Sequence, residues 1–182
     1  MAVARRHQDA YYWPLTPSKC ATLWLAVDDV DESNGPMKFV SQSHLHGKIA
    51  HGGSEPEEHN VLSLTVPGAE RYGSAVQVVS PLRAGQASLH SDLLLHSSDA
   101  NSSSRRRCGV ALTYHTPDVR MNLPGDRAPA DFFGWVCRGH DPAGYWAENV
   151  EPPHGENVPD RGDGGKLESK NYKLSQQERS KL

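Results

Sequence analysis

Short β-rich runs separated by explicit turn signals constrain the fold of this chain more than any other feature of its sequence. The runs are rich in β-branched and aromatic residues, and apolar residues at helical spacing are nearly absent. Glycine, proline and asparagine lie between the runs and supply the positive or fixed φ angles that turns need. Many short strands at this spacing predict an all-β sandwich or barrel with few helices. The expected strands span residues 22–27, 38–40, 61–66, 75–79, 108–114 and 132–137.

The length and composition of the chain predict one folded domain followed by a tail. Its 182 residues suffice for one domain with an apolar core but not for two ordinary domains. From about residue 152 onward proline, glycine and charged residues dominate, so burial cannot offset the entropy lost on ordering. We therefore expect a folded core over residues 1–151 and a mobile tail over 152–182. Ser175 and Glu178 have the spacing of a capping box, which predicts one short helix in the tail.

Charge and cysteine content exclude several classes of protein. The 19 basic and 22 acidic residues are mostly interspersed, so neither nucleic acid nor a membrane surface is expected as a partner, and a small molecule is. Cys20, Cys108 and Cys137 lie far apart and form no CxxC pair, which argues against a disulfide scaffold or a zinc ribbon. No apolar run approaches the ~20 residues of a membrane span. We expect a soluble, cytoplasmic protein.

Two His-x-Asp triplets are the first candidates for a chemical site. A mononuclear iron that activates oxygen needs two histidines and one carboxylate on one face, with the opposite face open. His-x-Asp can supply two of these ligands, because residues i and i+2 of a strand point to the same side. The spacing alone is weak evidence, since ~0.7 such triplets are expected by chance at this content of His and Asp. The chain has two, His7-Gln8-Asp9 and His90-Ser91-Asp92.

The residues downstream favour the first triplet. A triad built on the second triplet needs a later histidine, and the later histidines are followed by no recognisable anchor for a co-substrate; they are His115, His140 and His154. The first triplet has a better partner in His96, where an apolar strand ends and a polar turn leads to three arginines and a new strand. A guanidinium on that strand can bind a carboxylate with two parallel hydrogen bonds.

At this point the chain resembles the phytanoyl-CoA dioxygenase family of iron- and 2-oxoglutarate-dependent oxygenases, over roughly residues 7–140. Four blocks carry the resemblance: HQDAYYWPL, ATLWLAVDDVDESNGPMKFVSQSHLHG, GQASLHSDLLLHSSDANSSSRRR and CGVALTYHTPDVR. In that family an HxD motif precedes two strands joined by an Asn-Gly turn, and the arginine that binds 2-oxoglutarate follows the distal histidine by eleven positions. His96 and Arg107 have this spacing. The resemblance therefore implies that His7, Asp9 and His96 hold the iron and that Arg107 anchors 2-oxoglutarate.

The resemblance implies two further positions beside the co-substrate. Ser98 corresponds to a hydroxyl that helps to hold the distal carboxylate of 2-oxoglutarate, and Trp13 to an aromatic residue that lines the pocket in some members. The chain departs from the family pattern in two turns. SQSH stands where many members have PGSH, and HSSDAN stands where they have HGSxPN. Both changes affect turn geometry rather than the ligands.

The HxD motif lies unusually close to the N-terminus for this family. Relatives carry a long preceding segment that supplies helices and the first strands, whereas six residues precede His7 here. We therefore expect an N-terminally incomplete gene product whose sheet lacks neighbours. An unpaired strand edge and exposed apolar surface would then promote self-association.

Other residues have simpler interpretations. His90 is expected to line the pocket or to be a hydrogen-bonded structural histidine, not a ligand. The histidine-containing segment 44–59 is expected to be an exposed loop near the mouth of the site, although a second metal site is the alternative. Trp24, Leu25 and Val27 are expected to belong to the core. The first two arginines of the run are expected to be solvated.

The resemblance also implies a fold and an activity. The fold is a double-stranded β-helix (jelly roll, cupin-like) with the iron between two sheets at one open end. The activity is that of a 2-oxoglutarate-dependent dioxygenase, which uses O2 to hydroxylate a small organic substrate and releases succinate and CO2. Asp9 favours hydroxylation, because halogenating relatives have a small residue there so that chloride can bind. A jelly-roll metal-binding module or pseudoenzyme without turnover and a zinc hydrolase stay open, although the hydrolase leaves Arg107 without a role.

Overall fold

The computed structural model describes residues 3–13, 15–53, 60–62, 64–72, 77–122 and 136–146. This part of the chain consists of short strands and the loops between them. Its only helical elements are single 3-10 turns, which are η1 (Asp9–Tyr11), η2 (Ser43–His46) and η4 (Ala69–Arg71). The prediction of an all-β fold with few helices is confirmed.

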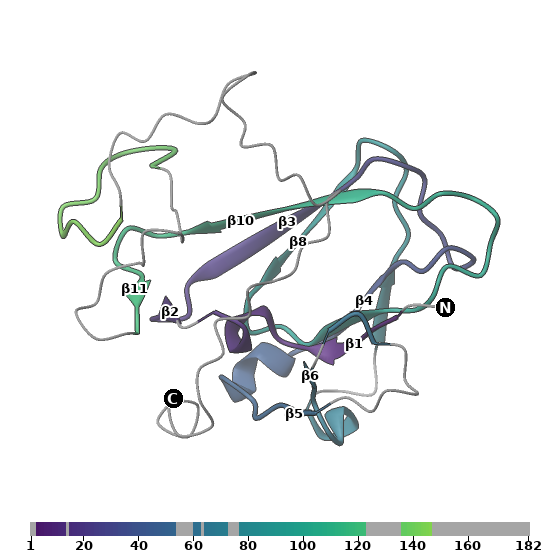
Figure 1. Cartoon of the computed structure of the whole chain (residues 1–182), viewed down its shortest axis with the longest axis horizontal. Helices are drawn as coiled ribbons and strands as arrows, with labels where there is room; N and C mark the ends of the chain where they lie inside the picture. Colours follow the sequence, from purple (N-terminus) through teal and green to yellow (C-terminus); the bar gives the residue numbers. More distant parts are fainter. Residues whose placement is uncertain are drawn as a thin grey trace, which may run out of the picture. The chain divides into compact units, whose positions relative to one another are not determined.

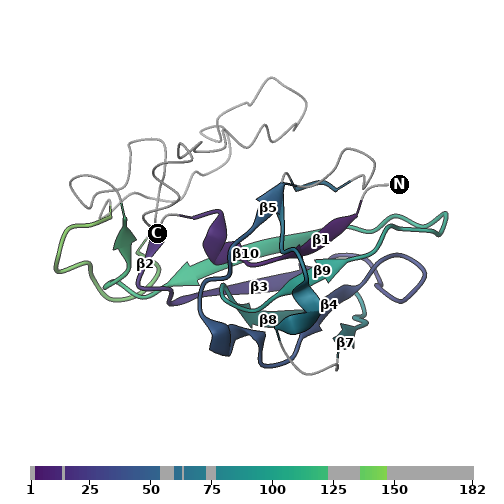
Figure 2. The ribbon, with the colours of Figure 1, turned by 90° about the horizontal axis from the view of Figure 1, so that it is seen from below.

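Two antiparallel sheets face each other (Figure 1). The four-stranded sheet has the order β1 (Ala4–His7), β9 (His96–Ser98), β4 (Met37–Val40) and β7 (Gln77–Ser80). The three-stranded sheet has the order β10 (Gly109–His115), β3 (Cys20–Ala26) and β8 (Ala87–Ser91). Figure 2, seen from below, shows the strands of both layers overlapping. Two small ladders complete the fold, one of β2 (Leu15–Thr16) with β11 (Arg120–Met121) and one of β5 (Gly52–Gly53) with β6 (Leu64–Thr65).

Most of the expected strands lie where the sequence predicts them. Strands β3, β4, β7 and β10 overlap the predicted segments. The prediction for residues 61–66 was too long, because β6 covers two residues of it and bends precede it. The expected strand at 132–137 lies almost entirely outside the described residues, as do the predicted boundary at 151 and the tail.

The central strand β3 shows which face of the three-stranded sheet points inward. Cys20, Thr22 and Ala26 are buried, as alternation in a strand requires. Trp24 shares this face and is half-buried. The expectation that Val27 belongs to the core is wrong, since it lies beyond the end of the strand and is 43% exposed.

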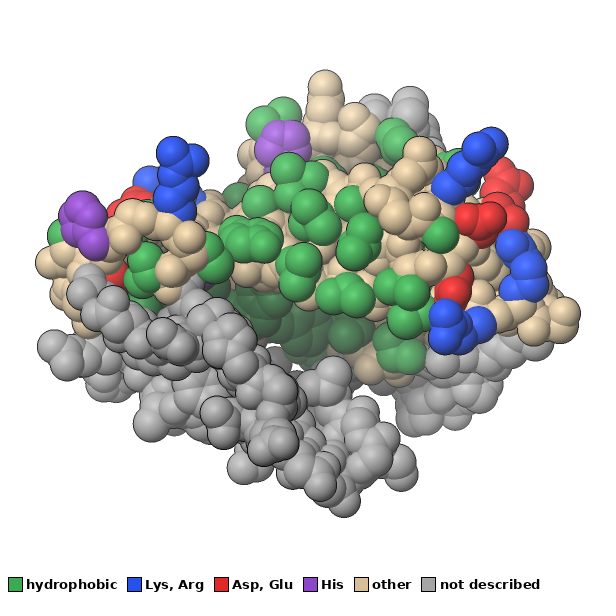
Figure 3. All heavy atoms as spheres, turned by 90° about the horizontal axis from the view of Figure 1, so that it is seen from above, with side chains coloured by type: hydrophobic (Ala, Val, Ile, Leu, Met, Phe, Trp, Pro, Cys, Tyr) green, Lys and Arg blue, Asp and Glu red, His purple; other side chains and the backbone are tan. Residues whose placement is uncertain are grey.

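The outer face of the three-stranded sheet is apolar and exposed. Leu89 on β8 is 69% exposed, and β10 adds the exposed side chains of Val110, Leu112 and Tyr114. Figure 3 shows hydrophobic side chains gathered over this face. Within the described residues β8 and β10 have no further strand neighbours. Exposed apolar surface beside open strand edges is what promotes association, so self-association stays a prediction for this chain.

The Asn-Gly turn lies in the loop between β3 and β4 and contacts the loop between β9 and β10. Gly35 has φ +82°, and a Cβ there would lie 2.3 Å from the carbonyl oxygen of Asp99, directly after β9. Only glycine allows both this conformation and this close approach. Ser102, in the loop between β9 and β10, donates two hydrogen bonds to the carbonyl of Ser33. The loop after β3 therefore positions the loop that leads from β9 to β10.

Candidate metal centre

His7 and Asp9 point to the same side because the residue between them is extended. Strand β1 ends at His7, η1 begins at Asp9, and Gln8 between them has φ −116° and ψ 134°. The alternation of a strand therefore continues across the triplet. The fully buried side-chain amide of Gln8 donates to the carbonyls of Gly47 and Leu93 and accepts from the N–H of Ile49. These bonds fix the backbone from which both candidate ligands project.

The four-stranded sheet places His96 directly beside His7. The antiparallel register of β1 and β9 pairs the two histidines, and opposed residues have Cβ atoms about 4.5–5.5 Å apart. The centroids of the two rings are 4.1 Å apart. On the other side of β9, the register with β4 pairs His96 with Phe39. Strand pairing thus brings together residues that are far apart in the sequence.

The three candidate ligand atoms converge on one point. Asp9 Oδ1 lies 3.8 Å from His7 Nε2 and 3.5 Å from His96 Nε2. All three atoms lie within 4.8 Å of one another, and no other such group of potential ligands is found among the described residues. The first triplet and His96 therefore come together, as the sequence predicts.

Backbone carbonyls set the tautomer of both histidines. His7 Nδ1 lies 2.7 Å from Arg5 O, and His96 Nδ1 lies 2.9 Å from Leu94 O. A carbonyl can only accept, so each Nδ1 carries the proton and each Nε2 directs a lone pair toward Asp9. Such a bond from the far ring nitrogen is the usual way in which proteins orient a metal-binding histidine.

Burial keeps both imidazoles neutral at physiological pH. Burial and the neighbouring His96 lower the pKa of His7 to about 3. Burial likewise lowers the pKa of His96. Burial raises the pKa of Asp9, but the neighbouring imidazoles of His90, His96 and His7 outweigh burial and lower the pKa overall. The site therefore offers two neutral imidazoles and one carboxylate, which suits a divalent cation.

The stability of the metal-free protein is expected to fall as the pH decreases below about 6.5, the ordinary histidine pKa. Below this pH the histidine is protonated in the unfolded chain, whereas in the folded chain His7 stays neutral down to its pKa of about 3. His7 alone therefore lowers the free energy of unfolding by up to about 1.4 kcal/mol per pH unit. Thermal melting between pH 7.5 and 4.5 measures this loss. His7→Gln should melt with a shallower pH dependence, and an identical dependence in the variant would contradict the lowered pKa.

Thr22 holds the second oxygen of Asp9. Its hydroxyl donates to Asp9 Oδ2 at 3.0 Å and lies 3.2 Å from the hydroxyl of Thr113 on β10. The two threonines are directly paired between β3 and β10. Sequence reasoning did not single out Thr22, although its inward position in a predicted strand was a usable signal. The contact leaves Oδ1 free to face the two histidines.

The second triplet does not form a rival site. His90 is buried on β8, and its Nε2 lies 3.5 Å from Asp9 Oδ2, so it joins the first site instead. Asp92 is buried as well, and burial raises the pKa of its carboxyl. Of the later histidines, His115 packs against Trp146 with the ring centroids 4.2 Å apart, and His140 is exposed. His154 lies outside the described residues.

A set of buried polar atoms without partners lies on the inner face beside the triad. Within the described part of the chain, no hydrogen bond reaches Ser88 Oγ, Arg107 Nε or either ring nitrogen of His90. Arg107 lies over the ring of Trp24, 5.3 Å from its centroid, and Ser88 pairs with Trp24 on the other side. Burial lowers the pKa of Arg107, but a guanidinium stays charged. Buried polar atoms of this kind normally have a partner, and a guanidinium and a hydroxyl are donors that can bind an anion.

Gly109 makes room for the aromatic platform under Arg107. A Cβ at this position would lie 2.1 Å from the Trp24 ring. Glycine is therefore required at the start of β10 if the Trp24 ring is to keep this position beneath the guanidinium.

The other arginines and the two secondary residues occupy different environments. Arg105 and Arg106 form exposed ion pairs with Asp31 and Asp28. The side chain of Ser98 follows that of His96 by two residues on β9, which puts both on one face. Trp13 packs against an apolar cluster around β2 and β11, which consists of Leu15, Cys20, Val119, Met121 and Trp146. The roles of Ser98 and Trp13 toward a co-substrate stay predictions.

The histidine-containing loop contributes one residue to the site. His44 and His46 are exposed, as expected, but His51 stacks on Tyr11 at 4.1 Å. His51 Nδ1 lies 2.8 Å from Ile49 O, and its Nε2 accepts from the backbone N–H of Gln8. His51 therefore supports the backbone between the two candidate ligands. His59 lies outside the described residues.

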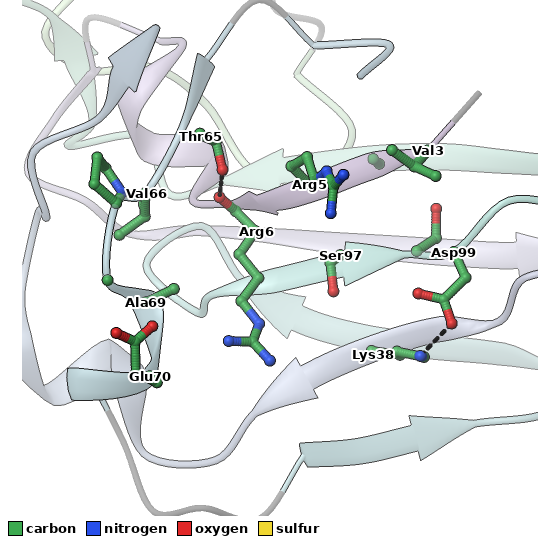
Figure 4. Close-up of a pocket in the computed structure, with 14 residues that line it drawn as sticks. Val3, Arg5, Arg6, Lys38, Thr65, Val66, Ala69, Glu70, Ser97 and Asp99 are labelled. Atoms are coloured by element: carbon green, nitrogen blue, oxygen red, sulfur yellow. Dashed lines mark hydrogen bonds and ion pairs between the residues drawn. The ribbon is translucent and has the colours of Figure 1, made fainter. Parts of the chain in front are cut away.

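A separate cavity of about 490 Å³ lies on the outer side of the four-stranded sheet. Figure 4 shows Arg6, Lys38 and Ser97 beside it, with the ion pair of Lys38 and Asp99 at one end. Lys38 and Ser97 alternate with Phe39 and His96, which face the triad, so the cavity and the triad lie on opposite faces of this sheet. The cavity therefore does not serve the candidate metal centre.

Comparison with known proteins finds structures with a similar fold. In the described part of the chain, no helix is long and apolar enough to cross a membrane. Comparison with curated proteins gives no match. The chain is similar to the non-heme monooxygenase ThoJ in its apo form, with 30% identity and a TM-score of 0.56 over 66% of this chain and 43% of that one. It is also similar to the epimerase SnoN in complex with Fe3+, alpha ketoglutarate and nogalamycin RO, with 26% identity and a TM-score of 0.54 over 72% of this chain and 51% of that one.

A third solved structure supports the fold alone. The non-heme alpha ketoglutarate dependent carbocyclase SnoK from nogalamycin biosynthesis is 24% identical, with a TM-score of 0.53 over 66% of this chain and 46% of that one. The chain thus spans about half or less of the length of these proteins. The family model of phytanoyl-CoA dioxygenase (PhyH) matches residues 2–109, more than half of the chain. The chain therefore has a double-stranded β-helix fold and belongs to the phytanoyl-CoA dioxygenase family.

Proposed function

We propose that this chain is the core of an Fe(II)- and 2-oxoglutarate-dependent oxygenase. His7, Asp9 and His96 would bind the iron, and Arg107 would bind the distal carboxylate of 2-oxoglutarate. The observation that carries the proposal is the convergence of the three ligand atoms within 4.8 Å. The catalytic core would comprise residues 1–151, followed by the tail 152–182.

The donor set fits iron that must keep open positions. Two imidazoles and one carboxylate on one face are the ligands of non-heme Fe(II) oxygenases, and they leave the other positions for co-substrate and oxygen. The lone pairs of both Nε2 atoms already face Asp9 Oδ1, so little reorganisation is needed when a cation enters. SnoN was solved with Fe3+ and alpha ketoglutarate, which supports the same pair of ligands here.

The inner face of the three-stranded sheet fits 2-oxoglutarate. Arg107 is a half-buried cation without an ion pair in the described residues, and its guanidinium can bind a carboxylate through two hydrogen bonds. Ser88 supplies a further buried hydroxyl without a partner. We propose that Ser98 helps to hold the same carboxylate and that Trp13 lines the approach to the pocket.

When bound, iron and 2-oxoglutarate would allow O2 to oxidise a small organic substrate, and succinate and CO2 would be released. The contribution of the chain is to hold the metal from one side, to orient the co-substrate through Arg107 and to exclude water. We propose hydroxylation as the outcome, because Asp9 occupies the position that a small residue takes in halogenating relatives. The similar structures include a monooxygenase, an epimerase and a carbocyclase. The proposal of hydroxylation can therefore be tested only with the substrate of this chain, by identifying the product.

Anaerobic titration of the metal-free protein tests the proposal directly. We expect one Fe(II) per chain, and we expect 2-oxoglutarate to raise the melting temperature only when the metal is present. Admission of oxygen should then release succinate. Iron binding without any succinate would identify a metal-binding module, and oxoglutarate-independent hydrolysis by the zinc form would identify a hydrolase.

A further inference from the structure

His90 is the buried side chain that the proposed chemistry leaves without a role. Its side chain is 2% exposed, and its ring packs beside Phe39 and His96 at centroid distances of 5.3 and 4.5 Å. Neither ring nitrogen has a hydrogen-bond partner within the part of the chain that the structure describes. Buried polar side chains are almost always hydrogen-bonded, so a histidine in this state points to a functional contact. His90 lies beside the candidate ligands without belonging to the group of converging ligand atoms.

The two oxygens of Asp9 lie in different surroundings. Oδ1 faces Nε2 of His7 and of His96. Oδ2 faces the Thr22 hydroxyl at 3.0 Å and His90 Nε2 at 3.5 Å. The second distance is long for a hydrogen bond, but contacts at catalytic sites are often long before ligands bind and shorten afterwards. Oδ1 of Asp9 is therefore placed to bind a metal, and Oδ2 contacts other side chains of the protein.

His90 is not set up as a metal ligand. His7, His51 and His96 each direct Nδ1 at the carbonyl two residues earlier, which leaves Nε2 as a lone-pair donor. His90 lacks such a bond among the described residues. An ionised carboxylate can only accept, so an attractive contact with Asp9 requires the proton on His90 Nε2. This tautomer cannot bind a metal through Nε2, and His90 lies outside the group of converging ligand atoms.

We propose that His90 is a positioning residue which, together with Thr22, holds Asp9 Oδ2 so that Asp9 binds the metal through Oδ1 alone. The direct pairing of Thr22 and His90 between β3 and β8 places both donors on the same side of Asp9. The inference rests on the proposed function, because its consequence concerns open positions at the metal. A carboxylate bound through both oxygens would occupy a position that the co-substrate and oxygen need.

Paired substitutions of His90 test this role with Co(II) as the probe. In His90→Gln the side-chain amide nitrogen can take the place of Nε2, whereas in His90→Asn it can take only the place of Nδ1. We expect the glutamine variant to keep the native Co(II) affinity, absorption spectrum and 2-oxoglutarate affinity. The asparagine variant and His90→Phe should bind Co(II) about 10–100-fold more weakly, as loss of outer-shell partners does. Their Co(II) spectra should change in shape, which a merely structural role would not produce.

Controls separate this inference from the proposed function. Leu89→Ser, on the exposed outer face of the same strand, should behave as the native protein. Because His90 and Thr22 act on one oxygen, His90→Phe combined with Thr22→Val should cost less than the sum of the single changes. Native Co(II) spectra and affinities in both His90→Asn and His90→Phe would overturn the role of His90 and leave the metal site intact. Native Co(II) binding in His90→Asn but not in His90→Gln would also overturn the role of His90. A native chain that binds no Co(II) would contradict the proposed function as well.

Discussion

His96→Ala is expected to abolish tight metal binding and, with it, oxoglutarate-dependent succinate release. The ring of His96 lies beside the rings of His7 and His90, and His96 contributes one of the three ligand atoms that converge in the described part of the chain. Changes to outer-shell partners already cost about 10–100-fold in affinity, so loss of a direct ligand should exceed this range. Titration of the metal-free variant with Fe(II) or Co(II) under anaerobic conditions measures the loss.

Two comparisons make the test of His96 specific. His44→Ala removes an exposed histidine and should bind metal as the native protein does. Asp9→Ala should lose metal binding to a similar degree, because the same site loses its only converging carboxylate among the described residues. Native metal affinity in His96→Ala would contradict the assignment of the whole triad.

Arg107→Ala is expected to weaken 2-oxoglutarate binding by about 2–5 kcal/mol, or roughly 30- to 5,000-fold, the usual loss when one partner of a buried charge pair is removed. The half-buried guanidinium lies over Trp24 with its Nε unpartnered in the described chain, so alanine would leave the carboxylate without its cation. Titration of the metal-loaded protein with 2-oxoglutarate in the absence of oxygen measures the change, and the metal affinity should be unaffected.

The neighbouring arginines are matched controls for Arg107. Arg105→Ala breaks an exposed ion pair with Asp31, which is worth about 0–1 kcal/mol, and should leave 2-oxoglutarate affinity unchanged. Arg107→Lys keeps the charge but not the planar pair of donors, so we expect an intermediate affinity. Unchanged affinity in Arg107→Ala would assign the anchor to another residue.

Local patterns in the sequence predicted the all-β fold and five of the eleven described strands, but not β1, β8 and β9, which carry His7, His90 and His96. Alternation and turn residues depend on neighbours close in the chain, so β3, β4 and β10 could be located without a structure. The ends of strands were less predictable. The two-residue β6 within the predicted segment 61–66, and the exposed Val27, depend on what packs against each segment.

An HxD spacing and the resemblance to the phytanoyl-CoA dioxygenase family were enough to select His7, Asp9 and His96 as candidate ligands and Arg107 as the candidate anchor, because both depend on residues close together in the chain. The surroundings of these residues depend on the tertiary structure. Strand register, which depends on contacts between distant segments, placed Thr22 and His90 on the second oxygen of Asp9. It also brought His51 under the backbone of Gln8. Alternation along one strand tells which face a side chain occupies, but not which residue of another strand lies opposite it.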